Sequence, residues 1–462
     1  MENKDRKQPM PNSNHPLMSK LHRLGIRQGD AVAIRSENSV QFAKMALSCW
    51  QLGAVIIPVS TRYPSRKVLS TLDDLSVHAF FTSRDFKTVV PKTESFFIND
   101  FVGGGSTDWT PDPYDKNKFD LQANASLIMT TGSSAKPKAV LHTLENHYFS
   151  ALGADDNISF GPGDKWLASL PMYHISGFSL IARALLHGGT IVCPAPKQPL
   201  VESIRQYDMT HLSVVPTQLI QLLEDPACVR KLKTLTAILL GGASLPLSLI
   251  QKAMALELPI YRTYGSTEMA SQITTTSGKD WFDGNDSTGQ PLKYRRVKLT
   301  LEGEILVKGE PLFKGYVSEN SIDLAVDDDG FFHTGDTGCF DAKNNLHLTG
   351  RKDSMFISGG ENIHPEEIEQ AIGCIKSVEQ VVVVGIEDAR FGKRPVAFIK
   401  TRQGRRFDSG RAKEVLQDRL ERFKIPDDFL PWPQDFCPFL KPNRSEFQAR
   451  ATELIRPKRP RQ

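Results

Sequence analysis

The sequence predicts an α/β protein, and three observations lead to this fold class. Short apolar runs that end in Gly or Pro recur from residue 126 onward and indicate buried strands: SLIMTTG, KWLASLP, TIVCPAP, HLSVVP, TAILLGG and PIYRTYG. Amphipathic stretches long enough for helices separate them, among them ISGFSLIARALLHGG, PTQLIQLLEDP and PLSLIQKAMALE. Residues 21–90 repeat the strand, helix, strand order. This alternation favours a parallel sheet covered by helices.

Two further units follow along the chain. Residues 287–350 contain short strands and turns typical of antiparallel pairing: GEILVKG, GFFHTGD and NNLHLTG. After GRKD comes a smaller unit of about 110 residues, with helices expected at HPEEIEQAI and RAKEVLQDRLERF and strands at VEQVVVVGI and RPVAFIK. We therefore predict two domains, residues 1–352 and 353–462.

Composition sets limits on location and partners. The 462 residues carry 57 Lys and Arg against 53 Asp and Glu, a net charge of +4, and the six cysteines are scattered without C-x-x-C pairs. A solvated end is the favoured interpretation of the basic tail RPKRPRQ, so no nucleic-acid partner is expected. The N-terminus lacks a signal-type apolar stretch, and no apolar run approaches membrane-spanning length. We expect a cytoplasmic protein without stable membrane insertion.

One loop has the composition of a phosphate site. Parallel sheets bind ligands beyond the carboxyl ends of their strands, and TTGSSAKPK at residues 130–138 follows a predicted strand. The loop offers hydroxyls, backbone N–H groups and the ammonium groups of Lys136 and Lys138 to an anion. It is not a Walker loop, because Pro137 stands where that loop needs its second Gly. A surface turn rich in Ser and Lys is the alternative.

Two other predicted strand ends offer groups suited to a nucleotide. In TYGSTE, Tyr264 could stack on a base, Thr267 could bond a phosphate, and Glu268 could hold Mg²⁺ through oxygen. In LLGGAS, Gly242 and its neighbour leave bare backbone against which a flat ring could lie. The alternative for LLGGAS is a tight turn that needs glycine.

Three more polar residues fall in predicted loops. Asp336 in HTGDTG could accept hydrogen bonds from two ribose hydroxyls, and Arg351 in TGRKD could contact phosphate or ribose. His174 follows the strand end SLP. Simple turn chemistry is the alternative for Asp336, and a packed, satisfied side chain is the alternative for His174.

Taken together, these motifs resemble the signatures of the adenylate-forming acyl-CoA synthetases, relatives of luciferases and peptide-synthetase adenylation domains. The loop at 130–138 is similar to their T-S-G-[ST]-T-G-x-P-K-G motif through Thr130, Thr131, Gly132, Ser133, Ser134, Pro137 and Lys138, while Ala135 and Ala139 replace two glycines. TYGSTE resembles Y-G-x-T-E, and HTGD contains T-G-D. GRKDSMFISGGENIHPEEIE fills nearly every fixed position of the family's most specific run.

The resemblance implies a fold and a set of reactants. The fold is a large N-terminal domain of doubly wound sheets plus a small β-barrel-like subdomain, followed by a small mobile α+β C-terminal domain. The reactants are ATP, Mg²⁺, CoA and a small carboxylic acid. It leaves the oligomeric state open, with a homodimer among the alternatives.

The resemblance also implies roles for individual residues. For ATP these are the phosphate-loop residues Thr130, Thr131, Gly132, Ser133, Ser134 and Lys138, the adenine-side residues Gly242, Ala243, Tyr264 and Gly265, the α-phosphate contact Thr267, the Mg²⁺ ligand Glu268, and the ribose contacts Asp336 and Arg351. The others are His174 at the acyl and pyrophosphate end, which with Gly242 also contacts the acid, the hinge Asp353, and Ser358, Gly359 and Gly360 toward CoA. The catalytic residues are Lys441, His174, Thr267 and Glu268. Leu440 and Pro442 depart from the family pattern around that lysine.

Within the family, several features resemble the 2-succinylbenzoate–CoA ligases of menaquinone synthesis: the Ala after PK with HT downstream, HISG with Arg183 one helical stretch later, SGGENIHPEEIE and FGKRPVAF. Arg183 would suit a substrate carboxylate because guanidinium makes a planar two-point contact, and a solvent-facing helix arginine is the alternative. Two other functions stay open, a ligase for another aryl or fatty acid and a non-catalytic nucleotide-binding relative.

Overall fold

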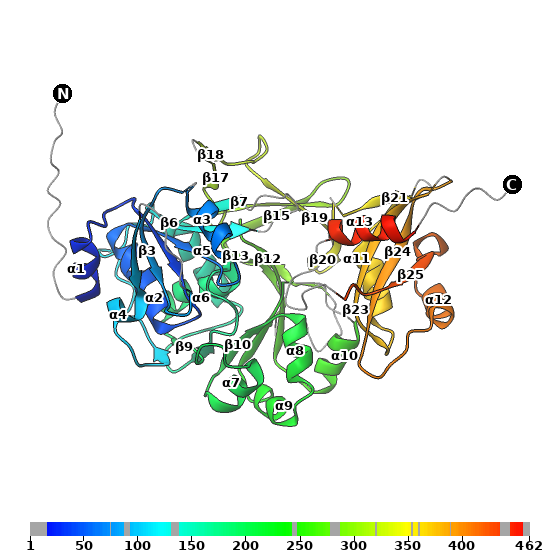
Figure 1. The fold of residues 1–462 in the computed structure, drawn as a ribbon, viewed down its shortest axis with the longest axis horizontal. Helices are drawn as coiled ribbons and strands as arrows, with labels where there is room; N and C mark the ends of the chain where they lie inside the picture. The colour runs from blue at the N-terminus through cyan, green and yellow to red at the C-terminus, as the bar shows by residue number, and fades with distance from the viewer. Residues whose placement is uncertain are drawn as a thin grey trace.

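The computed structural model describes residues 16–73, 75–86, 93–130, 138–242, 247–277, 287–318, 321–352, 354–358, 361–388, 390–434 and 444–455. Within these ranges the strands form two eight-stranded sheets, one four-stranded sheet and one five-stranded sheet. The first helix and the C-terminal unit lie at opposite ends of the long axis (Figure 1). The predicted α/β class, with a large N-terminal and a small C-terminal domain, is confirmed.

The first eight-stranded sheet has the order β18-β17-β7-β6-β2-β1-β3-β4. Strands β6, β2, β1, β3 and β4 run parallel, whereas β6, β7, β17 and β18 pair antiparallel. The strands are β1 Ala31–Arg35, β2 Val55–Pro58, β3 Val77–Thr82, β4 Glu94–Phe97, β6 Asn124–Thr130, β7 Lys138–Thr143, β17 Gly315–Ser318 and β18 Ser321–Asp323. The accompanying helices are α1 Pro16–Arg23, α2 Val40–Leu52, α3 Ser65–Asp73, α4 Ile98–Val102 and α5 Leu144–Asp155.

The second eight-stranded sheet has the order β14-β13-β12-β11-β10-β8-β9-β5, with β12, β11, β10, β8 and β9 parallel. Its strands are β5 Asp108–Trp109, β8 Lys165–Leu167, β9 Thr190–Val192, β10 His211–Val214, β11 Ala237–Leu240, β12 Ile260–Ser266, β13 Ser271–Thr275 and β14 Gln290–Pro291. Its helices are α6 Ile175–His187, α7 Leu200–Gln206, α8 Pro216–Leu222, α9 Pro226–Leu232 and α10 Leu247–Ala255. The predicted parallel strands and intervening helices are confirmed.

Two smaller sheets complete the chain. The predicted barrel-like unit is a four-stranded antiparallel sheet of β15 Arg295–Leu299, β16 Glu304–Gly309, β19 Phe332–Phe340 and β20 Leu346–Arg351. The C-terminal unit contains β21 Phe356–Ser358, β22 Glu361–Ile363, α11 Pro365–Gly373, β23 Val378–Asp388, β24 Gly392–Thr401, α12 Ser409–Gln417, a 3-10 turn at Arg422–Lys424, β25 Asp428–Pro431 and α13 Arg444–Leu454. Residue 353 lies outside the described ranges, so the domain boundary there stays a prediction.

Helix α2 shows why these segments fold as they do. The Ser39 hydroxyl accepts the Phe42 N–H at 3.1 Å and caps the start of the helix. Gly53 ends it with φ +69°, a left-handed conformation that glycine adopts without strain. Most of the side chains between the two caps are buried, so α2 is an interior helix.

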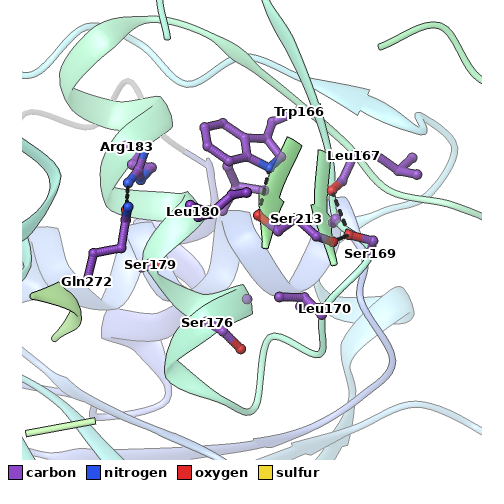
Figure 2. Close-up of a pocket in the computed structure, with 13 residues that line it drawn as sticks. Trp166, Leu167, Ser169, Leu170, Ser176, Ser179, Leu180, Arg183, Ser213 and Gln272 are labelled. Carbon is purple, nitrogen blue, oxygen red and sulfur yellow. Dashed lines mark hydrogen bonds between the residues drawn. The ribbon is translucent and has the colours of Figure 1, made fainter. Parts of the chain in front are cut away.

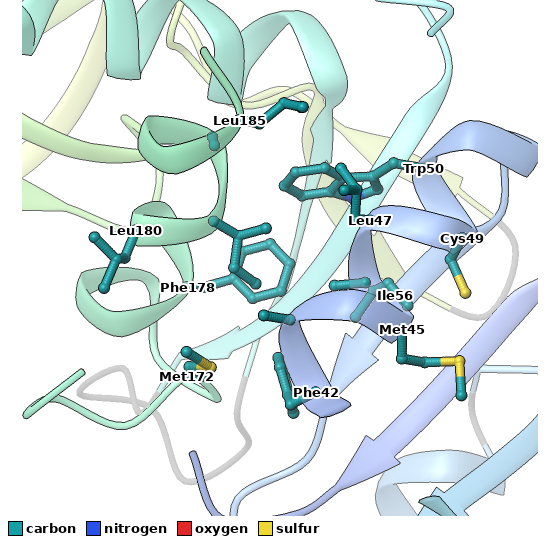
Figure 3. Packing of buried hydrophobic residues seen from close by; sticks show 14 of the residues in the cluster. Phe42, Met45, Leu47, Cys49, Trp50, Ile56, Met172, Phe178, Leu180 and Leu185 are labelled. Carbon is teal, nitrogen blue, oxygen red and sulfur yellow. The ribbon is translucent and has the colours of Figure 1, made fainter. Parts of the chain in front are cut away.

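Helices α2 and α6 meet at an aromatic cluster in the largest core (Figure 3). The Phe178 ring of α6 packs edge-on against Phe42 at 6.4 Å and against Trp50 at 5.7 Å between centroids. The Trp50 indole donates to the Ala125 carbonyl at 3.0 Å, which joins this cluster to β6. None of the helices in the described ranges is long and apolar enough to span a bilayer.

We expect Phe178→Ala to lower the free energy of unfolding by about 3 to 5 kcal/mol, because it empties a well-packed site. Urea unfolding measured by tryptophan fluorescence would give the change. Leu301→Ala serves as the control, because the Leu301 side chain is exposed and its loss should change the free energy by less than about 0.5 kcal/mol. Equal effects of the two substitutions would contradict this account of the core.

Candidate active site

Two of the predicted loops are strands in the structure. TYGSTE begins inside β12, and HTGD lies inside β19. Strand β12 continues past its parallel neighbour and pairs antiparallel with β13. Gly265 permits this pairing, because a Cβ there would lie 2.0 Å from the Ser271 carbonyl oxygen. The prediction of loops was wrong at these points because close pairing after a glycine looks like a turn in the sequence.

The predicted ribose contacts come together across β19 and β20. Asp336 and Arg351 are cross-strand partners, and the Arg351 guanidinium lies 3.0 Å from one oxygen of the Asp336 carboxylate. The Tyr264 hydroxyl donates to the other oxygen at 2.6 Å. Burial and the neighbouring carboxylate raise the pKa of Tyr264 well above its ordinary value, so the phenol stays protonated and acts as a donor. Asp336 is therefore held at both oxygens, each of which keeps room for a further donor.

Glu268 lies beside a tyrosine that the sequence analysis missed. The Tyr316 hydroxyl donates to the Glu268 carboxylate at 2.7 Å, and the Lys138 ammonium lies 4.5 Å from the centre of the Tyr316 ring. Tyr316 thus brings the predicted phosphate lysine and the predicted Mg²⁺ ligand into one neighbourhood. Among the described residues no three His, Cys, Asp or Glu side chains cluster as a metal centre. A single carboxylate fits Mg²⁺, which takes other ligands from phosphates and water.

The phosphate loop connects two strands of a hairpin. Thr130 ends β6, Lys138 begins β7, and the two are paired, with the Thr130 hydroxyl 3.4 Å from the Lys138 carbonyl oxygen. The structure does not describe nine of the predicted residues, whose roles stay predictions: Thr131, Gly132, Ser133, Ser134, Ala243, Asp353, Gly359, Gly360 and Lys441.

Gly242 follows β11 with φ +85°, a conformation that favours glycine. A Cβ on the preceding Gly241 would lie 2.7 Å from the Thr263 side chain. The bare backbone expected at this strand end is therefore present, and it runs beside the first residues of TYGSTE.

Arg183 is buried at the side of a small cavity (Figure 2), so the alternative of a solvent-facing arginine is wrong. Its guanidinium donates to the Gln272 side-chain oxygen of β13 and lies 5.0 Å from the centre of the Trp166 ring. Burial lowers the pKa of Arg183 to about 10, which leaves it charged at neutral pH. The cavity is also lined by Leu170, Ser176, Ser179, Leu180 and Ser213. It lies at the carboxyl ends of β8 and β10, where the fold class places a ligand.

His174 precedes α6 at its N-cap position and is exposed. Ser176 and Gly177, the second and third residues after His174, line the Arg183 cavity, and His174 is not among the lining residues. Although part of the side chain is exposed, the protein around the ring removes some of its solvation, and this together with the Arg62 guanidinium lowers the pKa of His174. The ring is therefore neutral at neutral pH. A neutral imidazole can both donate and accept a hydrogen bond there.

Ser358 lies in β21 and is buried, and its hydroxyl lies 3.5 Å from the Arg394 guanidinium. The predicted CoA-side role would need the backbone or neighbours of Ser358 to make the contact, because its side chain faces the C-terminal core. That role stays a prediction.

Comparisons with known proteins decide the family. Residues 17–317 match the AMP-binding enzyme family, and residues 367–438 match the AMP-binding enzyme C-terminal domain. The chain belongs to the AMP-binding enzymes. The family predicted from the motifs is confirmed.

A relative and two solved structures similar to this chain are all named for the same acid, succinylbenzoate. The chain is 32% identical to 2-succinylbenzoate–CoA ligase from Listeria innocua, covering 89% of this chain and 86% of the relative. It is 28% identical, with TM-score 0.80, to o-succinylbenzoate CoA synthetase (MenE) from Bacillus subtilis in complex with the acyl-adenylate OSB-AMP, covering 96% and 91% of the two chains. It is 29% identical, with TM-score 0.78, to the same B. subtilis protein with ATP and magnesium, covering 90% and 88%.

We expect Asp336→Asn to raise the KM for ATP about tenfold, because the substitution removes the charge that strengthens hydrogen bonds from hydroxyl donors. Initial rates at varied ATP would measure the effect. Asp328→Asn, at an exposed position before β19, is the matched control and should leave this KM unchanged. An unchanged KM in Asp336→Asn would remove Asp336 from the nucleotide site.

Proposed function

We propose that this chain is an ATP-dependent acid–CoA ligase that forms the CoA thioester of 2-succinylbenzoate, a step of menaquinone biosynthesis, through an acyl-adenylate. Family membership supports the class of chemistry, an acid–thiol ligase that uses ATP, Mg²⁺ and CoA. The relatives at 30 to 32% identity support the acid. The single observation that carries the choice of acid is the buried cation Arg183.

The chemistry of the acid explains why a buried arginine suits it. 2-Succinylbenzoate has two carboxylates, one of which is activated while the other keeps its negative charge. Among the described residues no carboxylate lies within ion-pair distance of Arg183, whose hydrogen-bond partner is the neutral Gln272. The Asp155 carboxylate acts on Arg183 only from beyond that distance. A buried guanidinium without an anion in contact is costly, and a substrate carboxylate would offset that cost. A monocarboxylic fatty acid has no second charge to place there.

The cavity beside Arg183 is too small for the acid as it stands. Its volume is about 20 Å³, which is room for one water molecule. Binding therefore requires side chains to move, and the Gln272 amide is the group that must leave Arg183 for the carboxylate to take its place. The Gln272 side-chain oxygen therefore occupies the position at Arg183 that the substrate carboxylate would take.

In the first half-reaction, an oxygen of the acid attacks the α-phosphorus of ATP, and pyrophosphate leaves with the bond electrons. Lys138 and the hydroxyls of Thr130 and Thr267 would offset charge on the phosphates. Mg²⁺, held by Glu268 and phosphate oxygens, would neutralise part of the same charge when bound. Asp336 and Arg351 would hold the ribose, and Lys441 of the C-terminal domain would contact the reacting groups.

In the second half-reaction, the CoA thiolate sulfur attacks the activated carbonyl carbon, and AMP leaves with the electrons of the broken C–O bond. A turn of the C-terminal domain about Asp353 would withdraw Lys441 and bring residues 358–360 toward the thiol. The cytoplasmic location and the homodimer stay predictions.

The first test of the function is AMP release dependent on ATP and Mg²⁺. We expect release with 2-succinylbenzoate and thioester formation only when CoA is present, with much lower rates for benzoate and a medium-chain fatty acid. Lys441→Ala should abolish turnover. Preference for another acid would make the chain a ligase of that acid, and ATP binding without AMP release from any acid would favour the non-catalytic relative.

A second test concerns the acid. We expect Arg183→Gln to raise the KM for 2-succinylbenzoate by about 10- to 100-fold, because a hydrogen-bonded charge contact is lost, while any turnover of benzoate changes much less. Arg205→Gln, at an exposed position of α7, is the matched control and should change neither. Equal losses for both acids would show that Arg183 supports the fold rather than selecting the substrate.

A further inference from the structure

The turn that carries Thr267 and Glu268 has a strained backbone. It joins β12 to β13, and two successive non-glycine residues in it have positive φ, Ala270 at +49° and Ser271 at +129°. Side chains rarely adopt these conformations, and such strain persists only where the surroundings impose it. Met269 and Ala270 are buried, whereas Thr267 and Glu268 lie half-buried at the predicted phosphate side.

Three donors from outside the turn hold its carbonyl groups. The His142 imidazole lies 2.7 Å from the Thr267 carbonyl oxygen, the Phe313 N–H donates to Glu268 at 2.7 Å, and the Ser150 hydroxyl donates to Ala270 at 2.8 Å. These donors come from β7, from the segment before β17 and from α5. The Thr267 carbonyl oxygen also accepts the Ala270 N–H of the turn itself at 3.0 Å. Within the turn that bond closes one ring of chain, and the three outside donors fix the turn to elements far from it in sequence.

Among the three donors, His142 is the one whose own side chain is oriented by further buried hydrogen bonds. A carbonyl oxygen only accepts, so Nε2 of His142 carries the proton. Burial lowers the pKa of His142 to about 4, which leaves Nδ1 as an acceptor for the Ser126 hydroxyl at 3.2 Å. The Ser126 oxygen in turn accepts from Nε2 of His147 at 2.8 Å. This chain of hydrogen bonds fixes the tautomer and orientation of the His142 ring.

The chain ends on the aromatic core. The His147 ring stacks on Trp50 with centroids 5.5 Å apart and lies 5.4 Å from Phe178, two rings of the cluster in Figure 3. Ser126 and His142 have no exposed surface. A rigid connection thus runs from the packed interior to the backbone of the residue that precedes Glu268.

We propose that His142 is a positioning residue for the nucleotide: its Nε2–H holds the Thr267 carbonyl and so keeps the strained 267–271 turn in the conformation that presents Thr267 and Glu268 to the phosphates of ATP. The reaction in which it serves rests on the proposed function, but its effect on ATP binding does not. Ser150 supports the same turn from the other side.

The test compares variants that remove the donor with one that keeps it. We expect His142→Leu to weaken binding of ATP with Mg²⁺ and to raise the KM for ATP, each by about tenfold, with less than about a twofold change in the KM for the acid. His142→Gln, whose amide nitrogen can donate from a similar position, should recover most of the loss. Ser150→Ala should shift ATP affinity in the same direction by a smaller factor. Titration calorimetry on the free enzyme and initial rates would measure these effects.

Phe42→Leu is the matched control, because Phe42 is buried in the same core and lies outside both the turn and the hydrogen-bond chain that orients His142. It should lower the melting temperature yet leave ATP affinity unchanged. Loss of melting temperature in His142→Leu with unchanged ATP affinity would overturn the proposal, as would a His142→Gln variant no better than His142→Leu. If His142→Leu does not fold, His142→Asn replaces it, because the shorter amide does not reach the Thr267 carbonyl. Unchanged ATP affinity in His142→Asn would then overturn the proposal. Wild-type protein that binds ATP without forming AMP would refute the proposed function and leave this comparison intact.

Discussion

The site depends on a change of pairing within one strand. Residues Ile260, Tyr261 and Arg262 of β12 pair parallel with β11, whereas Thr263 to Ser266 pair antiparallel with β13. A strand can change partners in this way only at the edge of the parallel sheet, where its far side is free for a returning neighbour. The return brings Gln272 opposite Gly265, so the residue that bonds Arg183 lies directly beside the strand that carries Tyr264. The acid side and the nucleotide side of the site are thereby built on one hairpin.

Two arginines buried beside this hairpin, Arg183 and Arg295, both contact Gln272. Arg183 bonds Gln272, and Arg295 donates to the Gln272 carbonyl, to Ser150 and to the Lys293 carbonyl. Burial and the charge of Arg183 lower the pKa of Arg295 to about 9. Arg295 is saturated by protein oxygens and serves the structure, whereas Arg183 faces a cavity. The two guanidinium groups are buried to a similar extent, but only Arg183 is placed to bind a substrate carboxylate.

Much of the fold was predictable from one sequence, because apolar runs bounded by Gly or Pro mark buried strands directly. The motif residues Tyr264, Asp336 and Arg351 were singled out by their specific spacing, and the structure brings them together, while their roles stay predictions. Tyr316, Gln272 and His142 were not, because each acts through pairing between strands distant in sequence: Tyr316 lies opposite Val140, and His142 reaches Thr267 across 125 positions. A single sequence does not indicate which strands pair. The roles of the nine predicted residues outside the described ranges stay predictions.

The position of Tyr316 has a consequence for how this protein could evolve by recombination. Tyr316 belongs to β17 of the first eight-stranded sheet, yet its hydroxyl contacts Glu268 beside the second sheet. A gene exchange that replaced residues up to about the end of β14 with those of a relative would therefore separate the carboxylate from its donor unless both parents carried a tyrosine there. The matched family segment ends at residue 317, one position beyond Tyr316. The segment that must be inherited together to keep this contact is therefore longer than either sheet. Crossovers placed at the boundaries between sheets would still separate Tyr316 from Glu268.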